Sequence, residues 1–87
     1  MTNKLEYNDF IKTVSGILGI EEHELKPETH IYDDLGIDSL GMFSLGMNLI
    51  KVYKIKLPLS EVSTIATITD LFNSLKKHEE TLSQKKA

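Results

Sequence analysis

The chain contains no cysteine and no tryptophan, and all ten of its basic residues are lysine. Without cysteine it can form neither a disulfide framework nor a thiolate metal site, which suits a reducing cytosol. Arginine is the side chain that best binds phosphate through paired hydrogen bonds, so its absence argues against a nucleic-acid-binding module. No apolar run approaches the roughly 18 residues that a membrane span needs, and the first residues lack the apolar stretch of a signal peptide. We therefore expect a cytoplasmic protein that binds neither nucleic acid nor a membrane.

The length of 87 residues fits one small domain with a single core, and it is too short for a deep cavity with catalytic groups of its own. The net charge of −3 is unevenly distributed. Seven of the thirteen acidic residues lie within 21–38, namely Glu21, Glu22, Glu24, Glu28, Asp33, Asp34 and Asp38. Residues 39–60 contain no acidic residue and carry Lys51, Lys54 and Lys56. An acidic segment therefore leads into a mildly basic one.

The first amphipathic pattern predicts a helix over about residues 5–18. Apolar residues recur there at three- and four-residue steps, and Gly19 follows as the glycine that ends the helix. Residues 19–38 then form a long connection, which proline and glycine keep from being helical throughout. Its apolar residues are spaced to fix it to a core, so we expect an ordered loop that crosses the bundle. These residues are Leu25, Ile31, Leu35 and Ile37.

A second helix is predicted over about residues 39–54, and it has two apolar faces. The first face is made of Leu45, Leu49, Val52 and Tyr53, with Met42 alongside. The second face is made of Phe43, Met47 and Ile50, flanked by Lys51 and Lys54. A small bundle cannot easily bury both, so we expect the core to take Leu45, Leu49 and Tyr53. The second face would stay partly exposed as a partner surface, and its lysines would favour a partner with acidic groups.

The remaining residues complete a small bundle. Residues 60–65 predict a short helix or a single turn, and residues 67–70 match a capping box. Apolar spacing predicts a last helix over 68–77, followed by a flexible tail over 78–87. We therefore expect one domain over 1–77, an all-α four-helix bundle with three longer helices, one short helix and a long ordered first loop.

The most informative stretch is residues 33–40, Asp-Asp-Leu-Gly-Ile-Asp-Ser-Leu, which ends the loop and opens the second helix. Gly36 permits a tight turn with positive φ. Asp38 or Ser39 is expected to cap the helix, because a short side-chain oxygen can accept from the first-turn N–H groups. A phosphate on Ser39 would lie beside the positive end of the helix dipole. A lone serine at such a place usually serves only as a cap.

The stretch resembles the phosphopantetheine attachment motif of acyl carrier proteins, in which a serine follows an aspartate and precedes a leucine. The likeness covers roughly residues 5–77, with the same order and spacing of helices. It implies that Ser39, flanked by Asp38 and Leu40, carries 4′-phosphopantetheine as a covalent cofactor. A phosphopantetheinyl transferase would move this arm from coenzyme A. The arm's thiol would then hold acyl, aminoacyl or polyketide intermediates as thioesters for loading and chain-processing enzymes.

The resemblance also implies a monomer that is not itself an enzyme. Its second helix, however, departs from the pattern of fatty-acid carriers, which present Glu and Asp there to basic patches on their enzymes. The matching positions hold Gly41, Ser44, Ile50, Lys51 and Val52. A specialised biosynthetic pathway therefore fits better than standard fatty-acid synthesis. Gly41 and Gly46 each lower helix stability by up to about 1 kcal/mol relative to Ala, either without functional meaning or to let a partner or the arm approach closely.

Other sites fit the sequence less well. The aspartates at 33, 34 and 38 lack the ligand spacing of a calcium loop. The histidines His23, His30 and His78 show no ligand spacing, so we expect no metal, and His30 should lie on the surface or pack within the loop. A serine nucleophile would need a base, and no Gly-x-Ser-x-Gly motif is present. The alternative function is a carrier-fold interaction module that is never phosphopantetheinylated, with Ser39 serving only as a cap.

Overall fold

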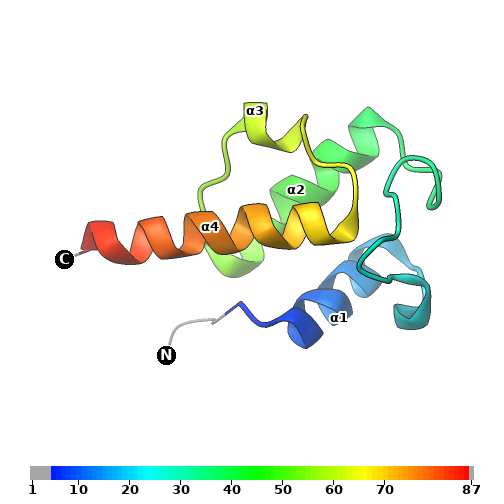
Figure 1. The fold of residues 1–87 in the computed structure, drawn as a ribbon, viewed down its shortest axis with the longest axis horizontal. Coiled ribbons are helices and arrows are strands. Elements are labelled where there is room, and N and C mark those ends of the chain that lie inside the picture. The colour runs from blue at the N-terminus through cyan, green and yellow to red at the C-terminus, as the bar shows by residue number, and fades with distance from the viewer. Residues whose placement is uncertain (1–4, 87) are drawn as a thin grey trace.

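The computed structural model describes residues 5–86, with side chains described for 5–79 except Leu59. The first four residues of the predicted domain and the last residue of the predicted tail lie outside this description. The elements are α1 (Tyr7–Leu18), a 3-10 turn (Glu22–Glu24), α2 (Ser39–Tyr53), α3 (Leu59–Val62) and α4 (Ile68–Lys86). The predicted all-α bundle with one short helix is confirmed. Figure 1 shows α2 and α4 running in the same general direction and α1 in the opposite one.

The first helix ends where the sequence predicts. Gly19 adopts a φ of 70°, which glycine tolerates, and its N–H donates to the Ser15 carbonyl at 2.8 Å. On the inner face of α1, Phe10 is fully buried. Its ring meets that of Phe72 on α4 edge-on, with centroids 5.2 Å apart. α1 and α4 therefore share the aromatic part of the core.

The second helix buries one apolar face and leaves the other outside, as predicted. Leu45, Leu49 and Tyr53 are buried, together with Met42. The second face stays partly exposed, because Phe43 and Met47 are exposed and Ile50 is half-buried. The placing of Val52 on the buried face is wrong, since this side chain is 41% exposed. Three residues after Leu49, it is rotated by about 60° from the centre of the buried face.

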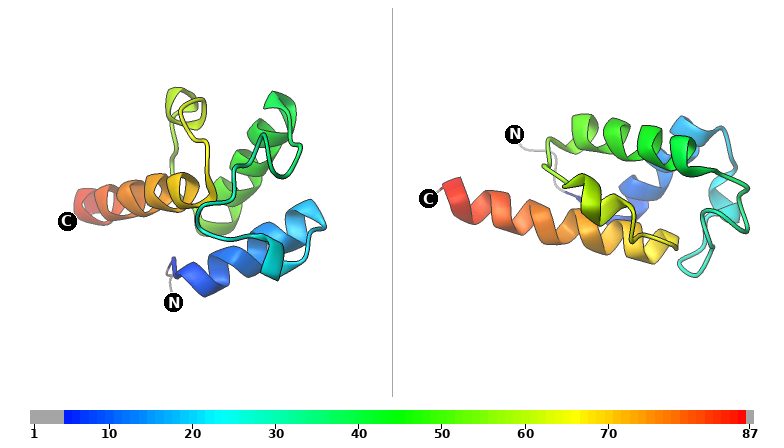
Figure 2. Two further views of the ribbon diagram at one scale, coloured as in Figure 1. Left: turned by 45° about the vertical axis from the view of Figure 1, so that its right-hand side comes forward. Right: turned by 90° about the horizontal axis from the view of Figure 1, so that it is seen from above.

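The first loop lies at one end of the bundle, beside the start of α2 (Figure 2). Backbone hydrogen bonds join it to the segment before α4: Ile31 N–H donates to the Ala66 carbonyl at 2.8 Å and Ile68 N–H to the Thr29 carbonyl at 3.0 Å. The prediction of an ordered loop that crosses the bundle is therefore confirmed. Backbone pairing satisfies polar groups that a loop over a core would otherwise leave without partners.

The predicted anchors of this loop are buried to different degrees. Leu25 and Ile31 are buried in the core. Leu35 and Ile37, which lie closer to Ser39, are half-buried and pack against the core's edge. Apolar side chains therefore fix the early part of the loop more firmly than the part that leads into α2.

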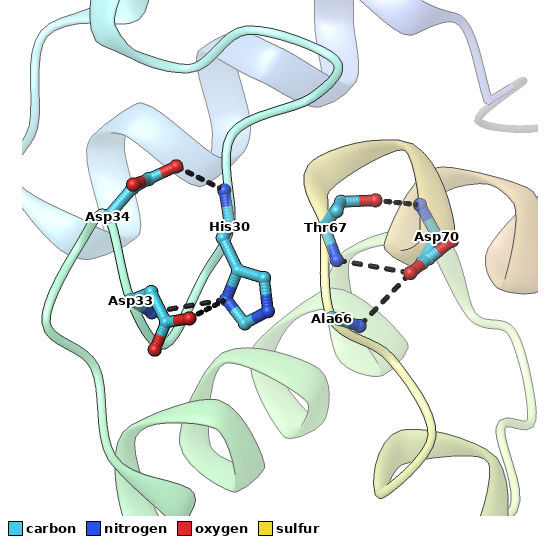
Figure 3. Close-up of polar contacts among 6 residues, drawn as sticks. All are labelled: His30, Asp33, Asp34, Ala66, Thr67 and Asp70. Carbon is cyan, nitrogen blue, oxygen red and sulfur yellow. Dashed lines mark hydrogen bonds and ion pairs between the residues drawn. The ribbon is translucent and has the colours of Figure 1, made fainter.

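The last helix begins with the predicted capping box, shown in Figure 3. Asp70 N–H donates to Thr67 Oγ1 at 3.1 Å, and Thr67 N–H donates back to Asp70 Oδ2 at 3.1 Å. Ala66 N–H adds a further bond to the same carboxylate oxygen at 3.2 Å. Reciprocal bonds of this kind satisfy N–H groups that a helix start leaves free.

The same helix is longer than the sequence predicted. The predicted end at residue 77 is wrong, because α4 continues to Lys86 through most of the segment expected to be a flexible tail. Its extension contacts the body of the protein: Glu79 Oε2 accepts from Leu5 N–H at 2.9 Å, and His78 Nε2 lies 3.7 Å from Glu61 Oε1 on α3. Tertiary contacts supply what the polar sequence of this segment lacks, since most helical stability in proteins comes from packing.

Candidate functional site

The site begins at the turn that delivers the chain to α2. Gly36 has a φ of 69°, a left-handed conformation that side chains other than glycine's adopt with strain. Its N–H donates to the Tyr32 carbonyl at 3.1 Å, which closes the turn. The predicted positive φ at this glycine is confirmed, and the turn sets the direction in which the next residues enter the helix.

Two glycines of α2 make room for neighbouring parts of the same chain. A Cβ at Gly41 would lie 2.7 Å from Ile37 Cγ2, so the half-buried Ile37 can pack on the first turn of α2 only because position 41 has no side chain. Gly46 is buried and faces Val62 of α3, at 3.7 Å from the place of a Cβ. The close approach for which these glycines provide is internal, and it involves the loop and α3.

Asp38, rather than Ser39, caps α2. Asp38 has an extended backbone, and its Oδ1 accepts from Gly41 N–H at 2.9 Å. Its carbonyl accepts from Met42 N–H at 2.9 Å. Ser39 is the first residue of the helix and is exposed. The idea that Ser39 serves as the cap is therefore wrong, and the hydroxyl of Ser39 is not needed to close the helix end.

The acidic residues before α2 are used to shape the loop (Figure 3). His30 N–H donates to Asp34 Oδ2 at 2.8 Å, and Asp33 N–H donates to His30 Nδ1 at 3.1 Å. An acceptor at Nδ1 requires that the ring proton of neutral His30 be on Nε2. The expectation that His30 packs within the loop is confirmed. In the part of the chain that the structure describes, no three metal-ligating side chains converge on one point.

The perturbed titratable groups tie helices together and lie away from Ser39 in the sequence. Burial raises the pKa of Tyr53, whose hydroxyl donates to Asp9 Oδ2 on α1 at 2.9 Å and lies 3.1 Å from Thr13 Oγ1. Partial burial acts to raise the pKa of Glu61 on α3, but a hydrogen bond from Ser74 and nearby charges outweigh it, so that this pKa is lowered. These groups join α1 to α2 and α3 to α4.

The residues of the predicted partner surface lie along α2 and just beyond it. Phe43 and Met47 are exposed, Ile50 is half-buried, and Lys51 and Lys54 are exposed. Sequence reasoning used Leu40 only as part of the serine motif, yet it is 79% exposed and lies beside Ser39. The three-residue step from Leu40 to Phe43 was the signal that could have joined it to the surface.

The fold and the site define a class of protein. It is a small helical domain, stabilised by its core, that presents an exposed serine hydroxyl at the start of a helix whose end is closed by a neighbouring aspartate. A hydroxyl that is exposed and not needed as a cap can be esterified without dismantling the helix, so the residues present fit a covalently attached phosphate-bearing group. None of the described helices is long and apolar enough to cross a lipid bilayer.

Comparison with known proteins identifies the family. Residues 8–75 match the sequence model of the family described as "Phosphopantetheine attachment site". The chain is 30% identical over 69 residues to the acyl carrier protein of Syntrophobacter fumaroxidans, covering 79% of this chain and 85% of that one. It is 38% identical over 63 residues to the acyl carrier protein of Clostridium acetobutylicum, covering 72% and 82%. The chain therefore belongs to the acyl carrier protein family, whose attachment domain carries covalent 4′-phosphopantetheine.

A further relative has a more specialised name. The chain is 33% identical over 67 residues to the meromycolate extension acyl carrier protein of Mycobacterium leprae, which covers 77% of this chain and 58% of that protein. Relatives named for general and for specialised acyl carriage thus lie at similar distances from this chain. The identities establish that it acts as an acyl carrier and leave its pathway to be inferred from its surface.

Proposed function

We propose that Ser39 is the attachment site of the 4′-phosphopantetheine arm, and that the loaded chain carries acyl, aminoacyl or polyketide intermediates as thioesters. The observation that carries this proposal is the separate use of two adjacent residues. Asp38 closes the end of α2 with its carboxylate and its carbonyl, while Ser39 projects from the first turn and is exposed. A transferase can reach the hydroxyl of Ser39 without unfolding the domain or removing a cap.

Attachment is a phosphoryl transfer from coenzyme A. The Oγ of Ser39 forms a bond to the phosphorus atom that bears pantetheine, the bond from this phosphorus to 3′,5′-ADP breaks, and 3′,5′-ADP leaves. The hydroxyl proton passes to a base on the transferase. The carrier's own nearby carboxylates are engaged elsewhere, since Asp34 binds the N–H of His30 and Asp38 that of Gly41. The remaining phosphodiester lies beside the positive end of the α2 dipole, which favours its negative charge.

In this proposal the chain is a monomeric carrier without catalytic activity of its own. Its partners are a phosphopantetheinyl transferase with coenzyme A, and the enzymes that load the thiol and process the bound intermediate. Tethering raises the local concentration of the intermediate at each partner, which is what a carrier contributes to the pathway.

The exposed surface of α2 favours a specialised pathway over standard fatty-acid synthesis. Lys51 is exposed, Ile50 is half-buried and Val52 is exposed, and no acidic residue occurs anywhere in residues 39–60. Enzymes that recognise a carrier through their own basic patches would find no carboxylate on this helix. We expect the malonyl-loading enzyme of a fatty-acid synthase to load this carrier at least about tenfold more slowly than a fatty-acid carrier. An equal rate would contradict the assignment to a specialised pathway.

The attachment site is tested by intact-mass measurement after incubation with coenzyme A and a broad-specificity phosphopantetheinyl transferase. The wild-type chain should gain the mass of one phosphopantetheine, and Ser39→Ala should gain none. Ser44→Ala is the matched control, because Ser44 is an exposed serine on the same helix and should not affect loading. Loading of the Ser39→Ala variant, or failure of the wild-type chain to load at all, would refute the proposal. The second outcome would favour the interaction module that is never loaded.

A further inference from the structure

The outer surface of α2 carries a continuous row of side chains that we call the α2 stripe: Leu40, Phe43, Met47 and Lys51, with Lys54 just past the helix end. Consecutive members are three or four residues apart, so they lie on one face of the helix. The apolar members are exposed by 79% at Leu40, 41% at Phe43 and 49% at Met47. Large apolar residues exposed in a row, rather than singly, indicate a surface that another molecule covers.

The stripe is not a loosely packed part of the core. The buried face of α2 centres on Leu49, which is fully buried. Met47 lies two residues earlier, and at about 100° per residue it points to nearly the opposite side of the helix. The stripe therefore faces away from α1, α3 and α4, and no rearrangement inside the bundle would be needed to cover it.

The chemistry of the stripe changes along its length. Its apolar end lies beside Ser39, and its cationic end lies at Lys51 and Lys54, which are both exposed. At a rise of about 1.5 Å per residue, Leu40 and Lys51 are about 16 Å apart along the helix axis. The lysines stand in a segment, residues 39–60, that contains no acidic residue to neutralise them. A molecule that covers the stripe should therefore be apolar where the arm emerges and acidic further along.

We propose that the α2 stripe docks the enzymes that act on the arm, through a partner groove that is apolar next to Ser39 and bears carboxylates about 16 Å away, opposite Lys51 and Lys54. This inference rests on the proposed attachment at Ser39. It names the chemistry of the partner, which is the reverse of a groove rimmed by lysine and arginine. Leu40 and Met47 supply the contact area, and the lysines fix the direction in which the groove runs along the helix.

Two other occupants fit the stripe less well. An anionic membrane would attract the lysines, but it would repel Asp33, Asp34 and Asp38, which are exposed at the apolar end. A second copy of the chain would cover Leu40 and so crowd the neighbouring Ser39, which has to stay accessible to enzymes. A partner enzyme can instead cover the stripe and receive the arm at the same time.

The test uses two forms of one broad-specificity phosphopantetheinyl transferase. One form has an apolar carrier groove rimmed by basic residues, and the other has these residues replaced by glutamate. We expect the wild-type chain to be loaded with a lower KM by the acid-rimmed form, and the double variant Lys51→Glu/Lys54→Glu to reverse this preference, each by about tenfold. Raising the salt concentration should reduce both preferences.

The apolar part of the stripe is tested without changing its charge. Met47→Ser should raise KM about fivefold to tenfold for both forms of the transferase. Asn48→Ser is the matched control, because Asn48 is an adjacent exposed residue that lies about 100° round the helix from Met47. Circular dichroism should show equal helix content for all variants, since each changed side chain is exposed.

The outcomes separate this inference from the function on which it rests. Loading is followed to completion at excess transferase, which reports attachment at Ser39, and KM reports docking. Failure of both transferases to load the wild-type chain would overturn the proposed function and the docking inference with it. Complete loading with no change in KM in the stripe variants would overturn the docking inference alone. A dimer in sedimentation, or binding to vesicles of neutral and anionic lipid, that Met47→Ser abolishes would likewise overturn it in favour of that occupant.

Discussion

Two connections link the longer helices of this carrier, and they are held in different ways. The first loop, residues 19–38, pairs its backbone with the segment before α4, through Ile31 N–H to the Ala66 carbonyl and Ile68 N–H to the Thr29 carbonyl. The connection over residues 54–65 contains α3, and its backbone bonds close short local turns, such as Ile65 N–H to the Val62 carbonyl at 3.2 Å.

The second connection is held to the bundle by side chains instead. Ile55, Leu57, Val62 and Ile65 are buried, and Glu61 reaches α4 by an ion pair with Lys77 at 3.4 Å. In the first loop the residues nearest Ser39, Leu35 and Ile37, are only half-buried. The comparison teaches that the segment leading to Ser39 is placed by backbone geometry, whereas α3 is placed by packing and charge. The two connections should therefore respond to different kinds of substitution.

The largest expected difference comes from one truncation made in each connection. Ile65→Ala removes a side chain that is 2% exposed and should lower the free energy of unfolding by about 2–4 kcal/mol. Ile37→Ala removes the same atoms from a half-buried position and should cost about 1 kcal/mol. Urea unfolding measures both. Equal losses would show that the approach to Ser39 depends on side-chain packing as much as α3 does.

A backbone substitution should reverse that order. Gly36→Ala places a side chain on a residue with a φ of 69° and should lower the free energy of unfolding by about 1–2 kcal/mol. The matched control is Gly16→Ala in α1, where a Cβ would meet nothing within 4 Å. That change should raise stability by up to about 1 kcal/mol, because alanine is the better helix former. If Gly36→Ala were as well tolerated as Gly16→Ala, the turn before Ser39 would not depend on its backbone conformation.

The capping box lies where the two connections meet, so its loss should affect both. Asp70→Ala removes the acceptor of the Thr67 and Ala66 N–H groups and should lower stability by about 1 kcal/mol. Exchange of the Ile31 amide proton, whose acceptor is the Ala66 carbonyl, should become faster. Asn73→Ala, at an exposed position of the same helix, is the control and should leave that exchange rate unchanged. An unaltered rate in Asp70→Ala would separate the cap from the first loop.

The smallest expected effect concerns acid. The pKa of Glu61 is lowered in the folded chain, so its contribution to stability is present above the unfolded-state value of about 4.3 and is lost as the pH falls through the folded-state value. Glu61→Gln should therefore be slightly less stable than wild type at pH 7, and the difference should shrink below about pH 4. Thermal unfolding across this pH range measures it. A difference that stays constant with pH would mean that charge does not hold α3 to α4.

Much of this architecture is written in local sequence. Periodicity and caps predict helices at the right places, with Gly19 ending α1, Asp38 capping α2 and the capping box opening α4, because each of these depends on residues close together in the chain. The same local pattern marks Ser39 and its neighbours and so points to the family. Local chemistry also predicts the turn at Gly36, since only glycine adopts its conformation without strain.

What the sequence by itself determined is the set of helices, the serine motif and the presence of two apolar faces on α2. Only the tertiary structure decided how far each face is buried, because burial depends on which helices pack on which side. It left Val52 exposed, made Gly41 the place where Ile37 packs, and added Leu40 to the α2 stripe. It also carried α4 beyond residue 77, since partners as distant in sequence as Leu5 and Glu61 stabilise a segment whose own pattern is too polar to predict a helix.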